Sequence, residues 1–135
     1  HDKLGELPMQ AYLGSNESIL VVDDIPEQRE IASSILKKLG YSVTTASSGE
    51  DALAQMGQRP VDLLVLDMIM EPGMDGLETY QRAIKLHPSQ RAVIASGFAE
   101  DQRVKKAMAL GVAQYIRKPY TLEKIGLAVK AALEN

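Results

Sequence analysis

Five short hydrophobic runs alternate along the chain with stretches whose apolar residues recur at helical spacing. The runs predict strands at residues 19–23, 42–46, 62–67, 91–95 and 113–117. The intervening stretches predict helices near 26–39, from a cap at Ser48 to about Gln58, and near 77–86, 100–110 and 121–133. Short apolar runs bounded by turn residues are typical of strands buried in a parallel sheet. The alternation therefore predicts βαβ units with right-handed crossovers.

Two of the predicted helices carry capping signals at their amino ends. Asp24 and Glu27 have the spacing of a capping box, and we predict that they cap the first helix. Ser48, followed by Asp51, is the predicted cap of the second helix. Pro60 excludes a continuation of that helix toward the third strand.

Length and composition limit the chain to one folded domain. Its 135 residues, 45% of them apolar, supply one sizeable core, which we assign to residues 18–135. Residues 1–17 show no convincing period and are interpreted as an N-terminal linker or tail. The chain has no cysteine, which excludes a disulfide framework and a thiolate metal site.

Charge and hydropathy narrow the choice of partners. A net charge of -3 and a pI near 5.4 argue against a direct nucleic-acid contact, because nucleic-acid binders carry basic stripes. The longest apolar runs are far shorter than the roughly 20 residues that a membrane helix requires. We therefore expect a cytoplasmic domain without direct membrane contact, even if a membrane sensor tethers the whole protein.

Reactive side chains stand at the carboxyl ends of four predicted strands. Asp23 and Asp24 end the first, Asp67 the third, Ser96 follows the fourth, and Lys118 follows the fifth. The carboxyl ends of parallel strands meet at one edge of the sheet, so we expect these side chains to share one crevice. Carboxylates 4 Å apart repel by about 1–4 kcal/mol per pair, and such a cluster requires a cation. Because the cluster holds neither His nor Cys, its oxygen atoms favour Mg²⁺, and the open coordination positions and Lys118 suit a phosphoryl group.

Each of these residues also has an ordinary structural interpretation when it is taken alone. Asp24 suits a helix cap, Asp67 and Ser96 suit turns, and Lys118 suits a solvated surface. Their common position at one edge of the predicted sheet favours the functional interpretation.

Four local motifs resemble the response-regulator receiver domain over residues 18–135. They are Val21-Val22-Asp23-Asp24, then Asp67 with the loop 70–76, then Ser96-Gly97, and finally Tyr115-Ile116-Arg117-Lys118-Pro119. The resemblance implies a flavodoxin-like, doubly wound (βα)5 fold with a five-stranded parallel sheet of order 2-1-3-4-5. It also implies a two-component phosphorelay in which a histidine kinase or a histidine phosphotransfer domain donates a phosphoryl group from phosphohistidine.

The resemblance assigns a role to each residue of the crevice. Asp67 matches the phospho-acceptor, and Lys118 matches the counter-ion of the phosphoryl group. Asp24 and Asp67 match direct Mg²⁺ ligands, Asp23 a carboxylate that acts through water, and Ile69 the residue whose backbone carbonyl binds the metal. The domain would thus help to catalyse its own phosphorylation and dephosphorylation.

The resemblance further implies a conformational switch. Ser96 and Tyr115 match the switch pair, in which the hydroxyl turns toward the phosphoryl group and the aromatic ring moves inward. The expected output surface comprises the fourth helix, the last strand and the last helix, which also offer a homodimer contact. A cis bond is expected between Lys118 and Pro119.

One departure from the family pattern lies in the loop after Asp67. The usual Asp-x-x-Met-Pro is lengthened here by one residue before Pro72, and we expect the additional Glu71 to face solvent. This loop and the lead-in Leu13-Gly14-Ser15 resemble receivers attached to hybrid sensor histidine kinases. A stand-alone single-domain regulator and an unphosphorylated docking module of the same fold are the alternatives.

Two apolar residues bear on how long a phosphoryl group would last. Ile69 and Phe98 occupy positions where polar side chains in similar domains often orient the hydrolytic water. Neither side chain can hydrogen-bond water, so we predict slow dephosphorylation.

Two other functions fit the sequence less well. A flavin- or nucleotide-binding module of the same architecture would place backbone donors, Ser, Thr or Gly after the first strand, where this chain has Asp23 and Asp24. A haloacid-dehalogenase-type phosphohydrolase would begin with Asp-x-Asp, whereas this chain has Asp67-Met68-Ile69.

Overall fold

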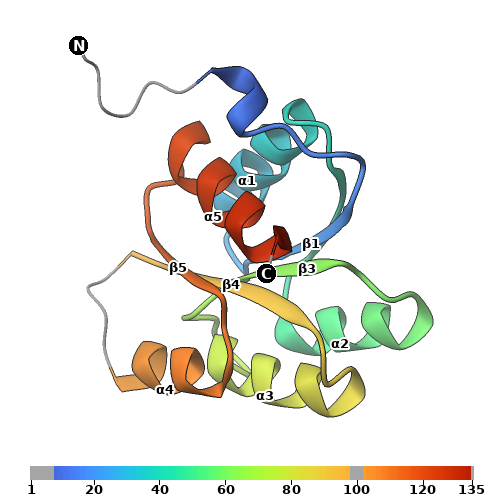
Figure 1. The fold of residues 1–135 in the computed structure, drawn as a ribbon. Helices are drawn as coiled ribbons and strands as arrows, with labels where there is room; N and C mark the ends of the chain where they lie inside the picture. The colour runs from blue at the N-terminus through green and yellow to red at the C-terminus, as the bar shows by residue number, and fades with distance from the viewer. Residues whose placement is uncertain (1–7, 98–101, 135) are drawn as a thin grey trace.

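The predicted five-stranded parallel sheet is present in the computed structural model, which describes residues 8–97 and 102–134 (Figure 1). The strand order β2-β1-β3-β4-β5 confirms the doubly wound fold. The strands are β1 (Ser18–Val22), β2 (Ser42–Ala46), β3 (Leu63–Asp67), β4 (Arg91–Ser96) and β5 (Gln114–Arg117). The helices are α1 (Pro26–Lys38), α2 (Gly49–Gln58), α3 (Gly76–Leu86), α4 (Gln102–Leu110) and α5 (Leu122–Glu134), after a short 3-10 turn η1 (Met9–Ala11).

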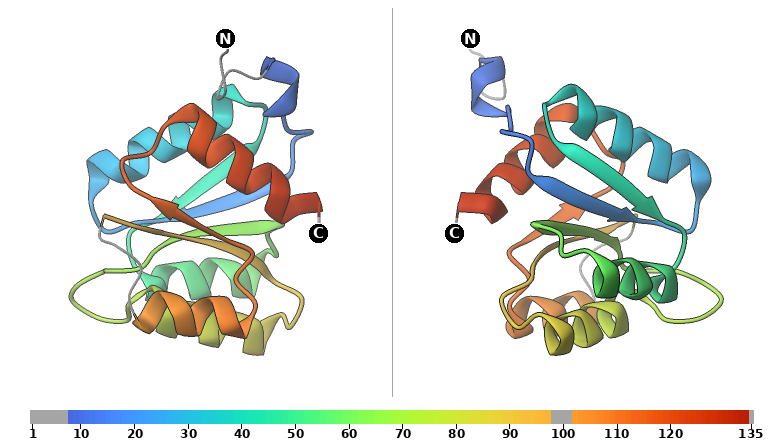
Figure 2. Two further views of the ribbon diagram at one scale, coloured as in Figure 1. Left: turned by 60° about the vertical axis from the view of Figure 1, so that its left-hand side comes forward. Right: turned by 90° about the vertical axis from the view of Figure 1, so that its right-hand side faces the viewer.

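Helices cover both faces of the sheet. Figures 1 and 2 show α1 and α5 on one face and α2, α3 and α4 on the other. Successive strand residues point to opposite faces, so Ile19 and Val21 pack toward α1 and α5, whereas Leu20 and Val22 pack toward α2–α4. Within the described part of the chain, no helix combines the length and the apolar character needed to cross a bilayer.

The register of the strands brings their carboxyl ends to one edge. Ile19 pairs with Leu63, and Asp67, the last residue of β3, pairs with Ala95 of β4. Ser96 then pairs with Arg117, the last residue of β5. The observed strand bounds differ from the predicted bounds by one residue at most, so the predicted site residues keep their places at this edge.

One predicted cap is wrong and another is confirmed. Ile25 is the N-cap of α1 and makes no side-chain cap, so Asp24 and Glu27 form no capping box. The Asp24 carboxylate instead accepts a long-range hydrogen bond from the backbone N–H of Glu71 (3.3 Å). Ser48 does cap α2, because its hydroxyl accepts the backbone N–H of Asp51 (3.0 Å).

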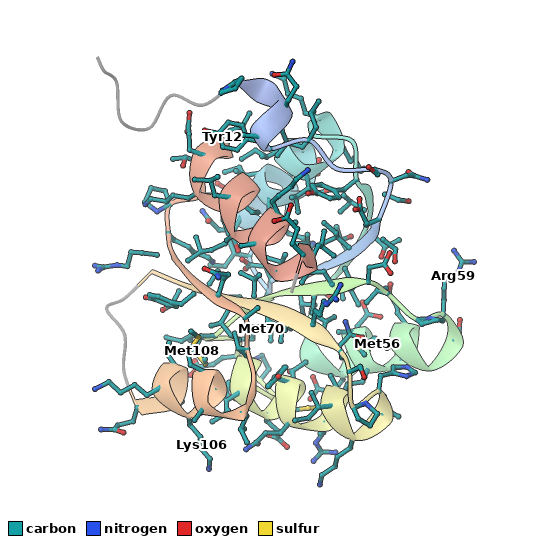
Figure 3. All side chains as sticks on the ribbon, in the orientation of Figure 1. Tyr12, Met56, Arg59, Met70, Lys106 and Met108 are labelled. Carbon is teal, nitrogen blue, oxygen red and sulfur yellow. The ribbon has the colours of Figure 1, made fainter. Side chains whose placement is uncertain are left out.

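The segment before β1, which the sequence suggests is a linker or tail, is attached to the domain through the Tyr12 side chain and the backbone of Gly14 and Asn16. Tyr12 is only 3% exposed and lies between η1 and α5 (Figure 3). A Cβ atom at Gly126 of α5 would stand 3.0 Å from the Tyr12 ring, so the helix offers a glycine where the ring approaches. The backbone N–H of Gly14 donates to Leu39 O (2.8 Å), which ties the segment to the end of α1.

Candidate functional site

Three aspartates meet at the carboxyl edge of the sheet. Asp23 and Asp24 directly follow β1, and Asp67 ends β3. One carboxylate oxygen from each lies within 4.8 Å of the others. Asp23 is fully buried and Asp67 is 4% exposed. The structure therefore brings together the acidic residues that the sequence predicts to share a crevice.

Lys118 supplies the positive charge in this crevice. Its Nζ donates a hydrogen bond to Asp23 Oδ2 (2.8 Å) and lies 3.2 Å from Asp67 Oδ1. Its backbone N–H donates to Ser96 O (2.8 Å), which ties the end of β5 to the end of β4. One ammonium group is thus shared between two buried carboxylates.

The balance of charge at the crevice remains negative. Burial, followed by the charge of Asp23, raises the pKa of Asp67 to about 6, against the opposing effect of Lys118. Desolvation disfavours the ionised carboxylate and a like charge adds to that cost. A further cation bound at this edge would therefore stabilise the ionised form of Asp67.

The donor atoms suit a hard divalent cation. Asp24 Oδ1 is buried and has no hydrogen-bond partner among the residues that the structure describes. A buried carboxylate oxygen without a partner is costly unless an ion or water satisfies it. The cluster offers only oxygen atoms from Asp23, Asp24 and Asp67, which is the chemistry that Mg²⁺ prefers.

The loop after Asp67 is held by backbone contacts. The N–H of Met68 donates to Ala95 O, and the N–H of Gly76 donates to Met68 O (2.8 Å each). A Cβ atom at Gly76 would lie 2.4 Å from Asp67 O, so this close approach requires glycine. The additional residue Glu71 is exposed, as expected, and its backbone N–H donates a hydrogen bond to the Asp24 carboxylate (3.3 Å).

A pocket of about 410 Å³ opens beside the acidic cluster. It is lined by Ile25, Gln28, Asp67, Ile69, Ser96, Gly97, Lys118 and Pro119. A wider hollow of about 920 Å³ runs along α1, but none of the predicted site residues lines it. The smaller pocket is therefore the one that adjoins the chemistry.

The remaining predicted residues lie around this pocket. Ser96 is buried at its wall, and the expected cis bond between Lys118 and Pro119 is present. Tyr115, in β5, pairs with Ile94 of β4. Its side chain is partly buried on the face of the sheet that α2–α4 cover, and it does not line the pocket. Phe98 lies outside the described residues.

Sequence reasoning missed one aromatic contact in the site. The ammonium of Lys118 lies 5.5 Å from the centroid of the Tyr120 ring. The signal was available in the sequence, because Tyr120 directly follows Lys118-Pro119.

Comparisons with known sequences identify a family and relatives of this chain. The family profile of the response regulator receiver domain matches residues 19–130. Sporulation initiation phosphotransferase F of Bacillus subtilis (strain 168) is 33% identical over 118 residues, which cover 87% of this chain and 94% of that protein. Sensor kinase CckA of Brucella abortus (strain 2308) is 32% identical over 125 residues, which cover 91% of this chain and 13% of that protein. The chain therefore spans nearly all of one relative and a small part of the other.

Two solved structures share the fold of this chain. The receiver domain of NtrX from Brucella abortus superposes with a TM-score of 0.81 at 32% identity, covering 86% of this chain and 98% of that chain. A CheY-like response regulator receiver domain protein from Methanospirillum hungatei JF-1 gives a TM-score of 0.82 at 28% identity, with coverages of 89% and 95%.

Proposed function

Because the chain belongs to the response regulator receiver domain family, we propose that it accepts a phosphoryl group from phosphohistidine on Asp67. The observation that carries this proposal is the shared ammonium of Lys118, which lies within 3.2 Å of oxygens of both Asp23 and Asp67. A nucleophilic carboxylate with an adjacent fixed cation is suited to phosphoryl transfer, which depends on positioning and charge stabilisation.

The proposed reaction uses three residues that line the pocket, Asp67, Ser96 and Lys118. An Asp67 carboxylate oxygen attacks phosphorus, the bond between phosphorus and the donor's imidazole nitrogen breaks, and the imidazole leaves with the bonding electrons. Lys118 stabilises negative charge on the transferring oxygens, and the Ser96 hydroxyl stands at the wall where the phosphoryl group arrives. Water later attacks the aspartyl phosphate and releases inorganic phosphate.

A divalent cation completes the charge balance in this proposal. We assign direct contacts to Asp24 and Asp67, a contact through water to Asp23, and a backbone carbonyl contact to Ile69. Mg²⁺ bound there supplies positive charge that neutralises the carboxylates and the phosphoryl oxygens. The partnerless Asp24 Oδ1 supports this assignment.

Phosphorylation would be read out through a switch at Ser96 and Tyr115. The new charge attracts the Ser96 hydroxyl and biases the position of Tyr115 in β5. The output surface that we propose comprises α4, β5 and α5. Exposed apolar side chains on both helices of this surface, Met108 and Leu110 on α4 and Leu127 on α5, support a contact there with a partner or a second copy.

Whether this domain stands alone or belongs to a larger protein is the second part of the proposal. We propose the receiver of a hybrid sensor histidine kinase in the cytoplasm, supported by the likeness to sensor kinase CckA. A stand-alone regulator is the alternative, supported by the near-complete coverage of phosphotransferase F. An immunoblot of the native polypeptide with an antibody against this domain decides between them, because a hybrid kinase is several times longer.

Acetyl phosphate with Mg²⁺ provides the test of the acceptor. The wild-type domain should gain the mass of one phosphoryl group, and Asp67→Asn should gain none. Asp51→Asn, at an exposed position in the first turn of α2, is the matched control and should react like the wild type. Wild-type protein that gains no mass with the phosphodonor would contradict the proposal and favour a docking module.

A further inference from the structure

Tyr120 contacts the same ammonium group that the carboxylates share. The Nζ atom of Lys118 lies 5.5 Å from the centroid of the Tyr120 ring, within the range of a cation–π interaction. Both partners are removed from water, because the Lys118 side chain is 12% exposed and Tyr120 is 7% exposed. Such contacts strengthen when the cation is desolvated.

The position of the ring is fixed by packing. Tyr120 belongs to the core between the sheet and the helices α1 and α5, together with Ile116, Ile125 and Val129. Its buried hydroxyl has no hydrogen-bond partner in the described part of the chain. A hydroxyl buried in this way is a cost to folding, and phenylalanine would fill the same space without it. The hydroxyl therefore does not explain the placement of the ring beside Lys118.

The distribution of charge around Lys118 changes during the proposed reaction. Before transfer, the ammonium is shared between Asp23 and Asp67. After transfer, one Asp67 oxygen is bonded to phosphorus and the carboxylate has lost its charge, so the negative charge lies on the phosphoryl oxygens. The contact with the Tyr120 ring does not depend on where that charge resides.

We propose that Tyr120 is a positioning residue whose ring keeps the Lys118 ammonium directed into the pocket while the negative charge moves from Asp67 to the phosphoryl group. This inference rests on the proposed function. Loss of the ring should lower the maximal rate of phosphorylation by acetyl phosphate about three- to tenfold, in line with the strength of a desolvated cation–π contact.

Two substitutions separate the ring from its hydroxyl. Tyr120→Leu removes the aromatic ring, whereas Tyr120→Phe keeps it and removes only the partnerless hydroxyl. We expect Tyr120→Leu to lower the maximal rate and to leave the acetyl phosphate concentration at half-maximal rate nearly unchanged. Tyr120→Phe should restore the wild-type rate within about twofold.

Tyr41 offers a matched control for loss of aromatic bulk. It lies in the same core, is 4% exposed and also has a buried hydroxyl without a described partner. It precedes β2, at the opposite edge of the sheet from Lys118. Tyr41→Leu should therefore destabilise the fold and still react at the wild-type rate once rates are corrected for the folded fraction measured by circular dichroism.

Nuclear magnetic resonance gives a readout that does not depend on turnover. The ring current of Tyr120 should shift the ε-methylene resonance of Lys118, and that shift should disappear in Tyr120→Leu and persist in Tyr120→Phe. The inference is overturned if Tyr120→Leu keeps the wild-type maximal rate, or if Tyr120→Phe or Tyr41→Leu loses as much. Should wild-type protein fail to react at all, the proposed function fails instead, and the Lys118 resonance still decides whether the ring contact exists.

Discussion

Replacing Asp67 with asparagine should stabilise the metal-free domain while it abolishes phosphorylation. Asp67 is 4% exposed, and burial together with the charge of Asp23 raises its pKa from 3.8 to about 6. A carboxylate that resists ionisation in the folded state costs stability at neutral pH, because the unfolded chain ionises it without that penalty. Asparagine has nearly the same shape and carries no charge, so the substitution removes the cost.

The size of the effect follows from the pKa of Asp67. Each unit by which the pKa differs between folded and unfolded chains corresponds to about 1.4 kcal/mol. A rise from 3.8 to about 6 therefore corresponds to about 3 kcal/mol in the free energy of unfolding at pH 8. The attraction of Lys118 is already included in that pKa. Asp51→Asn, at an exposed position, should change stability by less than about 0.5 kcal/mol.

The difference should depend on pH in one direction only. Because the folded pKa of Asp67 is the higher one, the folded domain takes up a proton more readily than the unfolded chain. The penalty is complete well above pH 6, shrinks as the pH falls through that value, and vanishes below pH 3.8, where both states are protonated. The stability advantage of Asp67→Asn should therefore shrink over the same range.

Urea denaturation in EDTA and in Mg²⁺ tests this reasoning. In EDTA at pH 8, Asp67→Asn should be the more stable protein. Mg²⁺ at about one hundred times its dissociation constant should stabilise the wild type by about 2.7 kcal/mol and nearly remove the difference. A variant that is less stable than the wild type in EDTA, or a stability difference that grows on acidification, would show that the charge of Asp67 does not destabilise the folded domain.

Three further predictions concern other parts of the chain. Ile69→Asn combined with Phe98→Glu should accelerate loss of the phosphoryl group in a decay assay, and an unchanged lifetime would count against apolar residues as the cause of slow hydrolysis. Tyr12→Ala should lower the free energy of unfolding by about 3 kcal/mol in urea denaturation, because Tyr12 is buried. Leu13→Ala, at the neighbouring exposed position, should have little effect. Equal effects of the two substitutions would mean that Tyr12 does not contribute to the core. Gly76→Ala should lower the free energy of unfolding by about 1–3 kcal/mol and slow phosphorylation, because the added Cβ would meet backbone atoms of Asp67 and Met68. Alanine otherwise favours helices over glycine, so a stabilised variant would refute that close approach.

The sequence predicted the acidic crevice because its signals are local. Apolar runs that end at Asp23, Asp67 and Lys118 predict strands, and a parallel sheet gathers the ends of such strands at one edge. The capping box of Asp24 failed because the side chain is drawn to a backbone N–H of a distant loop, which no local spacing reveals. The burial of Tyr12 was missed because one aromatic residue has no period, and its partner glycine lies in the last helix.

The identity of the modified aspartate is the most direct test of the account. After reaction with acetyl phosphate and Mg²⁺, borohydride reduction converts an aspartyl phosphate into homoserine, and peptide mass spectrometry locates the converted residue. The account predicts homoserine at position 67 alone. Homoserine at position 23 or 24, or elsewhere with position 67 unmodified, would contradict the claim that Asp67 is the acceptor at the centre of this pocket.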